Sequence, residues 1–411
     1  MKVTGIIAEY NPFHNGHAWH LAKSRHLTGA DYIVVAMSGD FVQRGTPAIT
    51  DKFSRAEMAL RAGADLVLEL PVPCALGSAE YFATGAISLL SSLQVVDALC
   101  FGSECADLDA LKQAADILAA EPQDFQVSLK KHLKEGLSFP SARQQALGEL
   151  TGDQEKAEAL LSLPNNILAL EYLKALKKLG SSIQPVPVLR VEDYHSTLLD
   201  SPKCSATAIR QALFSGKSPE ELAPFLPAEA LSILLREHKK KPWPSINDYS
   251  RIFAYELLKA ASPEDLMDCQ DLSPDLARRI FSFKNQFQDL ESFAMLLKTK
   301  QYTYSRIQRC LTHILLDLKA SDAAGIHVPG YPGYIRVLGF RKESAPLLAA
   351  IKKRSALPLL TRVKDASKLL SPESFQRLQK DLFASSVYHL TDPFSADGRN
   401  WNECSRQFLK L

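Results

Sequence analysis

Short apolar runs alternate with helical patterns of apolar and polar positions over roughly the first 210 residues of the chain. The apolar runs predict strands at residues 3–8, 32–37, 66–70, 98–101 and 183–189. Helical spacing is clearest at residues 16–30, 53–62, 78–90 and 165–179, and residues 106–180 are mostly helical in pattern. Near-continuous apolar strands that alternate with helices indicate an α/β fold with a parallel sheet covered on both faces.

The second half of the chain shows the helical pattern almost throughout. Five helices and two short strand-like pieces are predicted, at residues 220–237, 246–261, 274–286, 289–297 and 304–318, and at residues 330–340 and 357–363. The length of 411 residues is enough for two or three domains. We therefore predict an α/β domain at residues 1–213, followed by a mainly α-helical region at residues 214–411.

Residues suited to chemistry follow three of the predicted strands directly. His14 comes soon after the first strand, residues 38–40 follow the second, and Gly102 follows the fourth. Ligands of open parallel sheets bind beyond the carboxyl ends of the strands, where such residues gather. The pattern alone therefore predicts a binding site at this edge of the sheet. Two prolines in residues 183–189 place that strand near an edge.

The sequence His14-Asn15-Gly16-His17 stands between the first strand and the first helix. A helix N-terminus offers unpaired N–H groups and partial positive charge, and Gly16 lets an anion approach the backbone closely. Two imidazoles there can donate hydrogen bonds to phosphate oxygens and stabilise the charge that develops when an α-phosphate is attacked. The turn therefore predicts adenylyl chemistry.

Two other interpretations of this turn stay open. The histidines could be solvated residues of a surface turn. His14, His17 and His20 also recur every third residue, which raises metal binding, although the usual Cys and Glu partners of zinc are not adjacent. We expect no metal site built from protein ligands.

Further polar residues stand where they can reach a nucleotide. Lys52 and Arg55 lie one turn apart at a helix start, suited either to clamp a triphosphate or to solvated surface charge. Asn165 and Asn166 offer amide groups to adenine, and one of them can instead cap the helix that begins there. Asp40 can orient a nucleophile or contact Mg²⁺, and it is equally a common turn residue.

Four more candidates come after the fourth and fifth predicted strands of the α/β domain. Arg190 follows that strand, and Arg210 ends a Ser/Thr-rich turn in which Ser205 can cap a helix or donate to phosphate. Gly102 permits the close approach of a ribose or base. We expect all four residues to contact the nucleotide.

Composition is ordinary for a globular protein, with 46% apolar and 23% charged residues. No apolar run is long enough to span a bilayer, and no export signal precedes the first strand. Seven scattered cysteines without a Cys-x-x-Cys pair are typical of a reducing compartment. We therefore expect a cytoplasmic protein without a membrane partner.

Charge is distributed unevenly. Residues 1–200 carry 17 Lys and Arg against 24 Asp and Glu, a net charge of −7, whereas residues 201–411 carry 31 against 22, a net charge of +9. The basic half suggests a polyanion partner, although a solvated helical surface rich in lysine would give the same count. Cations clustered together or interleaved with tyrosines predict RNA contacts at Arg306, Arg309, Lys352, Lys353 and Arg354.

Seven segments resemble one known family. Residues 10–17 are similar to the nucleotidyltransferase superfamily, whose members attack the α-phosphate of ATP and release pyrophosphate, and closer still to the bacterial tRNA(Met) cytidine acetate ligases. The resemblance continues in order at residues 37–45, 101–104, 163–168 and 205–210, and more loosely at residues 302–306 and 334–338. It implies a nucleotidyltransferase-like Rossmann domain and ATP-dependent acetylation at N4 of the wobble cytidine of elongator tRNA(Met).

With the resemblance, the expected substrates are ATP with Mg²⁺, acetate and elongator tRNA(Met). Catalytic roles are expected for His14, His17, Asp40 and Lys52. Nucleotide contacts are expected from Ile7, Ala8, Glu9, Tyr10, Asn11, Pro12, Phe13, His14, Asn15, Gly16, His17, His20, Gly102, Asn165, Asn166, Arg190, Ser205 and Arg210. Two alternatives remain: an adenylyltransferase acting on a small phosphorylated metabolite, and a non-catalytic RNA-binding protein with a degenerate nucleotide site.

Overall fold

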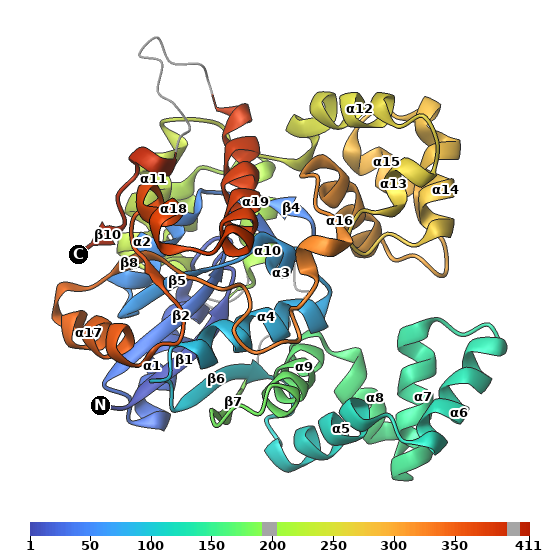
Figure 1. Cartoon of the computed structure of the whole chain (residues 1–411), viewed down its shortest axis with the longest axis horizontal. Coiled ribbons are helices and arrows are strands. Elements are labelled where there is room, and N and C mark those ends of the chain that lie inside the picture. Colours follow the sequence, from blue (N-terminus) through green and yellow to red (C-terminus); the bar gives the residue numbers. More distant parts are fainter. Residues whose placement is uncertain (191–203, 393–402) are drawn as a thin grey trace.

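The computed structural model describes residues 1–190, 204–392 and 403–411. Within these ranges, eight strands form one sheet in the order β10-β8-β5-β2-β1-β6-β7, with β9 beside β8 (Figure 1). Their bounds are β1 Val3–Ala8, β2 Tyr32–Ser38, β5 Leu66–Leu70, β6 Ala98–Ser103, β7 Gln184–Leu189, β8 Ile335–Phe340, β9 Leu359–Leu360 and β10 Leu409–Lys410. A separate short hairpin joins β3 (Phe41–Val42) to β4 (Thr46–Pro47).

The five strands predicted in the first half form the parallel part of this sheet. β7 is an edge strand, as its two prolines predict. β8 runs antiparallel to β5, and β9 and β10 pair parallel to β8. The last third of the chain thus completes the sheet that the first half begins. The boundary predicted at residue 213 therefore does not separate two sheets, because pairing between such distant strands leaves no local pattern.

Helices cover both faces of the sheet. Alternate strand residues point to opposite sides, and the residues on both sides are apolar. In β2, Ile33, Val35 and Met37 belong to one apolar core, and Val34 and Ala36 belong to the other. The first core includes residues of α1 (Asn15–Thr28), α2 (Lys52–Arg61), α10 (Ala206–Phe214) and α11 (Ala228–His238). The second includes residues of α4 (Ala79–Ser92), α5 (Leu108–Ala120), α9 (Pro164–Lys178) and α17 (Ala345–Arg354).

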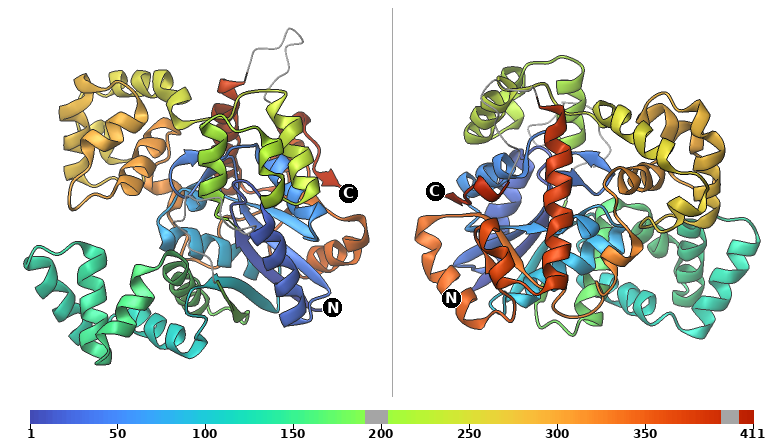
Figure 2. Two further views of the ribbon diagram at one scale, coloured as in Figure 1. Left: turned by 180° about the vertical axis from the view of Figure 1, so that it is seen from behind. Right: turned by 45° about the horizontal axis from the view of Figure 1, so that its top comes forward.

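Two helical lobes project from the sheet and are separate in both Figure 1 and Figure 2. One continues from α5 through α6 (Gln123–Lys134), α7 (Phe139–Thr151) and α8 (Gln154–Ser162). The other contains α12 (Ser250–Lys259), α13 (Glu264–Met267), α14 (Pro274–Phe283), α15 (Leu290–Leu297) and α16 (Tyr304–Leu315). The remaining α-helices are α3 (Val72–Ala75), α18 (Ala366–Leu369) and α19 (Pro372–Tyr388). No helix in the described ranges has the length and apolarity needed to cross a bilayer.

The predicted helix at residues 220–237 is divided in the structure. A 3₁₀ helix covers Pro219–Phe225, and α11 begins only after Pro227. Proline lacks a backbone N–H and cannot continue the hydrogen-bond ladder of a helix interior, so Pro224 and Pro227 interrupt the pattern. The apolar spacing alone does not record this break.

Candidate active site

A cavity of about 260 Å³ lies at the carboxyl ends of β1, β6 and β7. Most of the residues expected to contact nucleotide line it: Ile7, Ala8, Glu9, Tyr10, Asn11, His14, Gly16, His17, His20, Gly102, Asn165, Arg190, Ser205 and Arg210. Pro12, Phe13, Asn15 and Asn166 lie outside this lining; Phe13 belongs to the apolar core against α1. The edge predicted from the strand pattern is therefore the edge at which the cavity lies.

His14 and His17 form a reciprocal cap at the start of α1. The Nδ1 atom of His14 accepts from the backbone N–H of Gly16 at 3.1 Å, and the Nδ1 atom of His17 accepts from the backbone N–H of His14 at 3.3 Å. An imidazole that accepts at Nδ1 carries its proton at Nε2 when neutral. The turn thus fixes the same tautomer in both rings, with Nε2–H as the remaining donor.

Burial keeps these imidazoles neutral near pH 7. Burial, together with the positive charges of Arg190 and Arg210, lowers the pKa of His14 to about 3. Burial lowers the pKa of His17 well below its usual value, and the neighbouring His14 acts in the same direction. Burial and Arg190 lower the pKa of His20 to about 4, and the buried Nε2 atom of His20 has no hydrogen-bond partner within the described part of the chain. The positive charge of the cavity therefore comes from its arginines and helix ends.

Gly102 makes room for an arginine. A Cβ atom at this position would stand 2.6 Å from Cδ of Arg190, so the arginine stem crosses directly over the glycine. One Arg190 nitrogen donates to Oδ1 of Asn165 at 3.1 Å, and Asn165 also lines the cavity. The three predicted residues are thus one assembly, in which Gly102 and Asn165 hold the guanidinium group in place.

Asn166 has a structural position instead. Its buried Oδ1 accepts from the Ser103 hydroxyl at 2.6 Å and from the backbone N–H of Glu104 at 2.9 Å. The Glu104 carboxylate in turn accepts from the backbone N–H groups of Asn165 and Asn166 at the start of α9. Helix α9 begins at Pro164, so neither asparagine is its N-cap. This exchange of hydrogen bonds joins the end of β6 to α9 beside the cavity.

The start of α10 forms the other charged wall. Ser205 is the N-cap of α10, and its hydroxyl accepts from the backbone N–H of Ala208 at 3.1 Å. Arg210 donates to the Asn11 carbonyl at 2.6 Å and to the Thr207 hydroxyl at 3.2 Å. The N-termini of α1 and α10 therefore meet at one cavity, an arrangement that favours an anion.

The structure does not bring Asp40 and Lys52 to the cavity lining. Lys52 is buried, and its Nζ lies 2.7 Å from Glu69, 2.5 Å from Glu403 and 3.6 Å from Asp40. Asp40 accepts a hydrogen bond from the backbone N–H of Lys52 at 2.7 Å. Both side chains belong to a buried ion-pair cluster, so direct action on a substrate does not fit their positions.

Arg55 also lies outside the cavity lining, and it contacts the backbone of segments beside the cavity. Its buried guanidinium group donates to the carbonyl oxygens of Glu9, Ser38, Gly39 and Thr50. These carbonyls lie just beyond the carboxyl ends of β1 and β2 and before α2. A clamp on a triphosphate does not fit the positions of Lys52 and Arg55, because both side chains are buried and are paired with groups inside the protein.

The sequence did not identify several other lining residues. Gln43, Arg44 and Thr46 come from the β3–β4 hairpin, and Trp19 and Tyr172 come from α1 and α9. The hairpin strands have only two residues each, too short for periodicity to reveal. Resemblance at residues 37–45 was the available indication, but it did not separate the buried Asp40 from the hairpin residues that reach the cavity.

The residues expected to contact RNA do not form one surface. Arg309 lies on α16 and pairs with Asp271 at 3.1 Å, and Arg306 lies over the ring of Tyr302 at 5.4 Å. Lys352, Lys353 and Arg354 end α17, which lies on the opposite side of the molecule from α16 in Figures 1 and 2. Contact of these residues with RNA stays a prediction, and the two clusters require separate tests.

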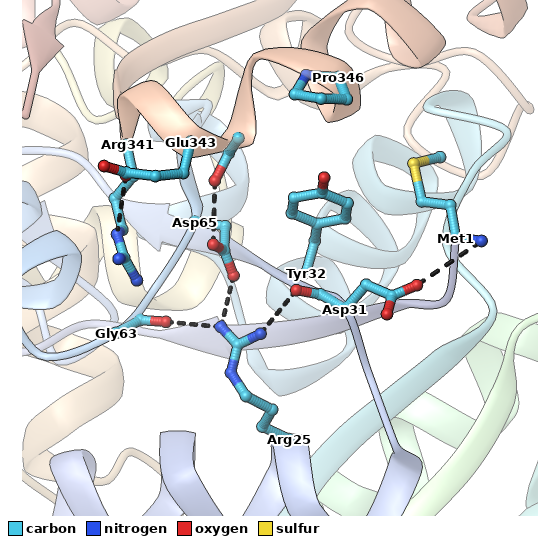
Figure 3. A pocket seen from close by; sticks show the side chains of 10 residues that line it. Met1, Arg25, Asp31, Tyr32, Gly63, Asp65, Arg341, Glu343 and Pro346 are labelled. Carbon is cyan, nitrogen blue, oxygen red and sulfur yellow. Dashed lines mark hydrogen bonds and ion pairs between the residues drawn. The ribbon is translucent and has the colours of Figure 1, made fainter.

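A second hollow, at the opposite edge of the sheet, is lined by polar groups that are paired with one another (Figure 3). Arg25 donates to the carbonyl oxygens of Asp31 and Gly63 and lies 2.5 Å from the Asp65 carboxylate. The Asp31 carboxylate lies 3.6 Å from the amino group of Met1. In the described part of the chain, no three His, Cys, Asp or Glu side chains gather as ligands for a metal ion. The cavity at the start of α1 is therefore the candidate active site.

The chain is similar to known proteins over nearly its whole length. The family model described as HIGH Nucleotidyl Transferase matches residues 1–403. Relatives named tRNA(Met) cytidine acetate ligase, from Thermoanaerobacter sp. (strain X514) and Caldanaerobacter subterraneus subsp. tengcongensis, are 43% and 44% identical to the chain, each over 95% of both sequences. Crystal structures of Thermotoga maritima TmcAL, apo and bound with alpha-thio ATP, align with TM-scores of 0.94 and 0.91, at 33% identity over 100% of both chains.

Proposed function

The chain belongs to the HIGH nucleotidyltransferase family and to its tRNA(Met) cytidine acetate ligases, and on this premise we propose that it acetylates a cytidine of tRNA(Met) with acetate and ATP. The acceptor is N4 of the wobble cytidine of the elongator tRNA. The observation that carries the proposal is the pair of tautomer-fixed imidazoles, His14 and His17, in a cavity that also holds Arg190 and Arg210.

In the first half-reaction, a carboxylate oxygen of acetate attacks the α-phosphorus of ATP. The bond to the bridging oxygen breaks, and acetyl-adenylate and pyrophosphate form. The Nε2–H donors of His14 and His17 stabilise the negative charge that develops on the α-phosphate oxygens. Arg190 and Arg210 supply fixed positive charge for the remaining phosphates. Neutral imidazoles suit this role because they donate without taking up a proton.

In the second half-reaction, the cytidine amino nitrogen attacks the acetyl carbonyl carbon. The mixed-anhydride bond breaks, AMP leaves, and the amine loses a proton to give the N4-acetyl amide. No acyl-CoA takes part in this scheme. Acetate is small, so a close-fitting pocket for its methyl group would exclude longer acids by steric clash.

The donor set fits ATP together with Mg²⁺. Two helix N-termini, the arginines Arg44, Arg190 and Arg210, and the Nε2 atom of His20, which has no hydrogen-bond partner among the described residues, suit a polyphosphate. Glu9 lines the same cavity, and its carboxylate accepts from the backbone N–H of Gln43 at 2.9 Å. One carboxylate with phosphate oxygens and water is a usual environment for Mg²⁺, which would neutralise phosphate charge.

Acetate-dependent exchange of labelled pyrophosphate into ATP tests the first half-reaction without RNA. We expect exchange with acetate, none without an acid, and a steep loss from acetate to butyrate. An AMP-containing product formed from a phosphorylated metabolite, without acetate-dependent exchange, would favour the plain adenylyltransferase. Acetylation of tRNA from acetyl-CoA in the absence of ATP would overturn the ligase assignment.

A further inference from the structure

A groove of about 1130 Å³ continues from the candidate active site. The groove and the cavity share five lining residues, Gln43, Arg44, Thr46, Thr207 and Arg210. A molecule lying in the groove therefore reaches the same side chains that border the proposed adenylate.

The groove has two walls and a floor from different parts of the chain. Thr207, Arg210, Gln211 and Phe214 lie on one face of α10, at helical spacing of three and four residues. The connection between α15 and α16, at residues 298–303, forms the other wall together with the start of α16, and the β3–β4 hairpin forms the floor. From Thr207 to Phe214 this wall extends about 10 Å, at 1.5 Å per helical residue.

Positive charge predominates among the lining residues. The cations are Arg44, Arg210, Lys298, Lys300 and Arg309, and Glu291 is the one carboxylate in this lining. Lys298 and Lys300 are exposed, and the structure gives no ion pair to either lysine among its described residues. Thr299, Thr303 and Ser305 add hydroxyl groups to the same wall. Cations and hydroxyls along one wall suit the phosphates and 2′-hydroxyls of RNA.

An aromatic ring stands at the far end of the groove. Phe214 is the last residue of α10, is 51% exposed and lines the groove together with these cations. Tyr304 lines the opposite wall at the start of α16. Exposed rings next to cations are the usual platform on which unstacked bases rest. The groove thus combines phosphate contacts with a stacking surface.

We propose that this groove seats the anticodon loop of the substrate tRNA and directs the target cytidine over the β3–β4 hairpin into the active site. The inference rests on the proposed function for the identity of the RNA. Lys298 and Lys300 contact the loop phosphates, and Phe214 stacks with a base beside the target. A protein partner is disfavoured by the excess of like charge in the lining, because the cores of protein interfaces are depleted of charged residues.

The test uses the full-length protein and the unmodified anticodon stem-loop of elongator tRNA(Met). The groove variant is Lys298→Ala with Lys300→Ala. The matched control is Lys2→Ala with Lys342→Ala, two exposed lysines at the opposite edge of the sheet, before β1 and after β8. Fluorescence anisotropy over a range of salt concentrations measures the affinity, and thermal melting verifies that both variants fold.

We expect the groove variant to bind more weakly and its log–log salt slope to fall by about 1.4, at ~0.7 for each lost phosphate contact of a single strand. The control should bind as the parent does. Phe214→Ala should weaken binding by about 5- to 150-fold, the range typical for losing one stacked base, and Phe214→Trp should restore it. Acetate-dependent pyrophosphate exchange should be unchanged in the lysine variants.

The failures of the two proposals are distinguishable. A parent protein without acetate-dependent exchange contradicts the proposed function, whatever its affinity for RNA. If exchange is intact and the groove variants bind the stem-loop like the parent, the RNA-binding proposal for the groove fails while the proposed function stands. The groove would then bind a partner other than nucleic acid. Equal losses in the groove and control variants would also overturn the RNA-binding proposal, because binding would then follow net charge rather than position.

Discussion

His14 and His17 owe their proposed role to the hydrogen bonds that their Nδ1 atoms accept from the turn of α1. The motif and its place before a helix could be recognised in the sequence, because spacing and residue type decide them. The lowered pKa values could not, since they depend on burial and on Arg190, which is distant in the chain. The tautomer follows from the backbone geometry of the turn, which residue types alone do not give.

Replacing either imidazole should slow adenylate formation. For His14→Ala and His17→Ala we expect a loss on the order of 10²–10³ in the rate of acetate-dependent pyrophosphate exchange, the usual effect of removing one charge-stabilising donor. Affinity for the stem-loop RNA should stay near that of the parent. Unchanged exchange in both variants would remove the histidines from the mechanism.

The pH dependence of exchange tests the neutral state of these rings. Burial lowers the pKa of His14 to about 3, so its imidazole stays neutral from pH 8 down to pH 5. We therefore expect no histidine titration in the exchange rate between pH 5 and 8, measured at saturating ATP and acetate. An inflection near pH 6.5 that disappears in His14→Asn would contradict this assignment.

Gly102 should act through Arg190, because a Cβ atom at residue 102 meets the arginine stem at 2.6 Å. Gly102→Ala should raise KM for ATP roughly tenfold, equivalent to about 1.4 kcal/mol of binding. The double variant with Arg190→Ala should be no worse than Arg190→Ala alone, since the two changes remove one interaction. Additive effects in steady-state kinetics would show that Gly102 acts on the nucleotide independently.

At the scale of elements, the β3–β4 hairpin joins the sheet to the lobe of α12–α16. The Gly45 carbonyl accepts from the Thr312 hydroxyl at 2.7 Å, and Gly45 has a φ of +78° against the backbone of α16. The apolar and helical patterns predicted the five parallel strands and most helices, because those elements are long and locally encoded. The hairpin contact with α16, which lies more than 260 residues away, leaves no such pattern.

Gly45→Ala should weaken this junction for two reasons. The added Cβ would stand 2.6 Å from the backbone nitrogen of Arg309, and the positive φ disfavours alanine. Gly152→Ala is the matched control, since Gly152 has a φ of +71° and a Cβ atom there would meet no atom of the described residues within 4 Å. We expect the free energy of unfolding of Gly45→Ala, measured by calorimetry, to lie about 1–3 kcal/mol below that of the control, the usual cost of overpacking. Equal free energies of unfolding for the two variants would mean that the contact of Gly45 with α16 does not contribute to stability.

At the scale of the whole molecule, a buried ion-pair cluster ties the end of the chain to the sheet. Glu403 lies 2.5 Å from Lys52 and also pairs with Arg336 of β8. Arg336 in turn lies 2.7 Å from Glu69 of β5. Lys52 was identifiable as a cation at a helix start, but its partners are the carboxylates of residues 40, 69 and 403, so only the fold reveals its role.

Glu403→Gln should destabilise the protein by about 3–5 kcal/mol at pH 7, because it leaves buried Lys52 and Arg336 with less negative charge. These cations lower the pKa of Glu403, so its contribution is present above its unfolded pKa, near ~4.3, and is lost as pH falls. Denaturant unfolding measures the change. Glu343→Gln, at an exposed carboxylate 3.6 Å from Arg341, is the control and should leave the free energy of unfolding unchanged. Similar effects of both substitutions would contradict the structural role of the cluster.

The central claim is that one chain activates acetate with ATP and transfers it to tRNA(Met). Mass spectrometry of nucleosides from unmodified elongator tRNA(Met), after incubation with the protein, ATP, Mg²⁺ and ¹³C-labelled acetate, tests it most directly. We predict a labelled N4-acetylcytidine at the wobble position that requires both ATP and acetate. Unmodified cytidine under these conditions, or an unlabelled acetyl group that requires acetyl-CoA, would contradict the account.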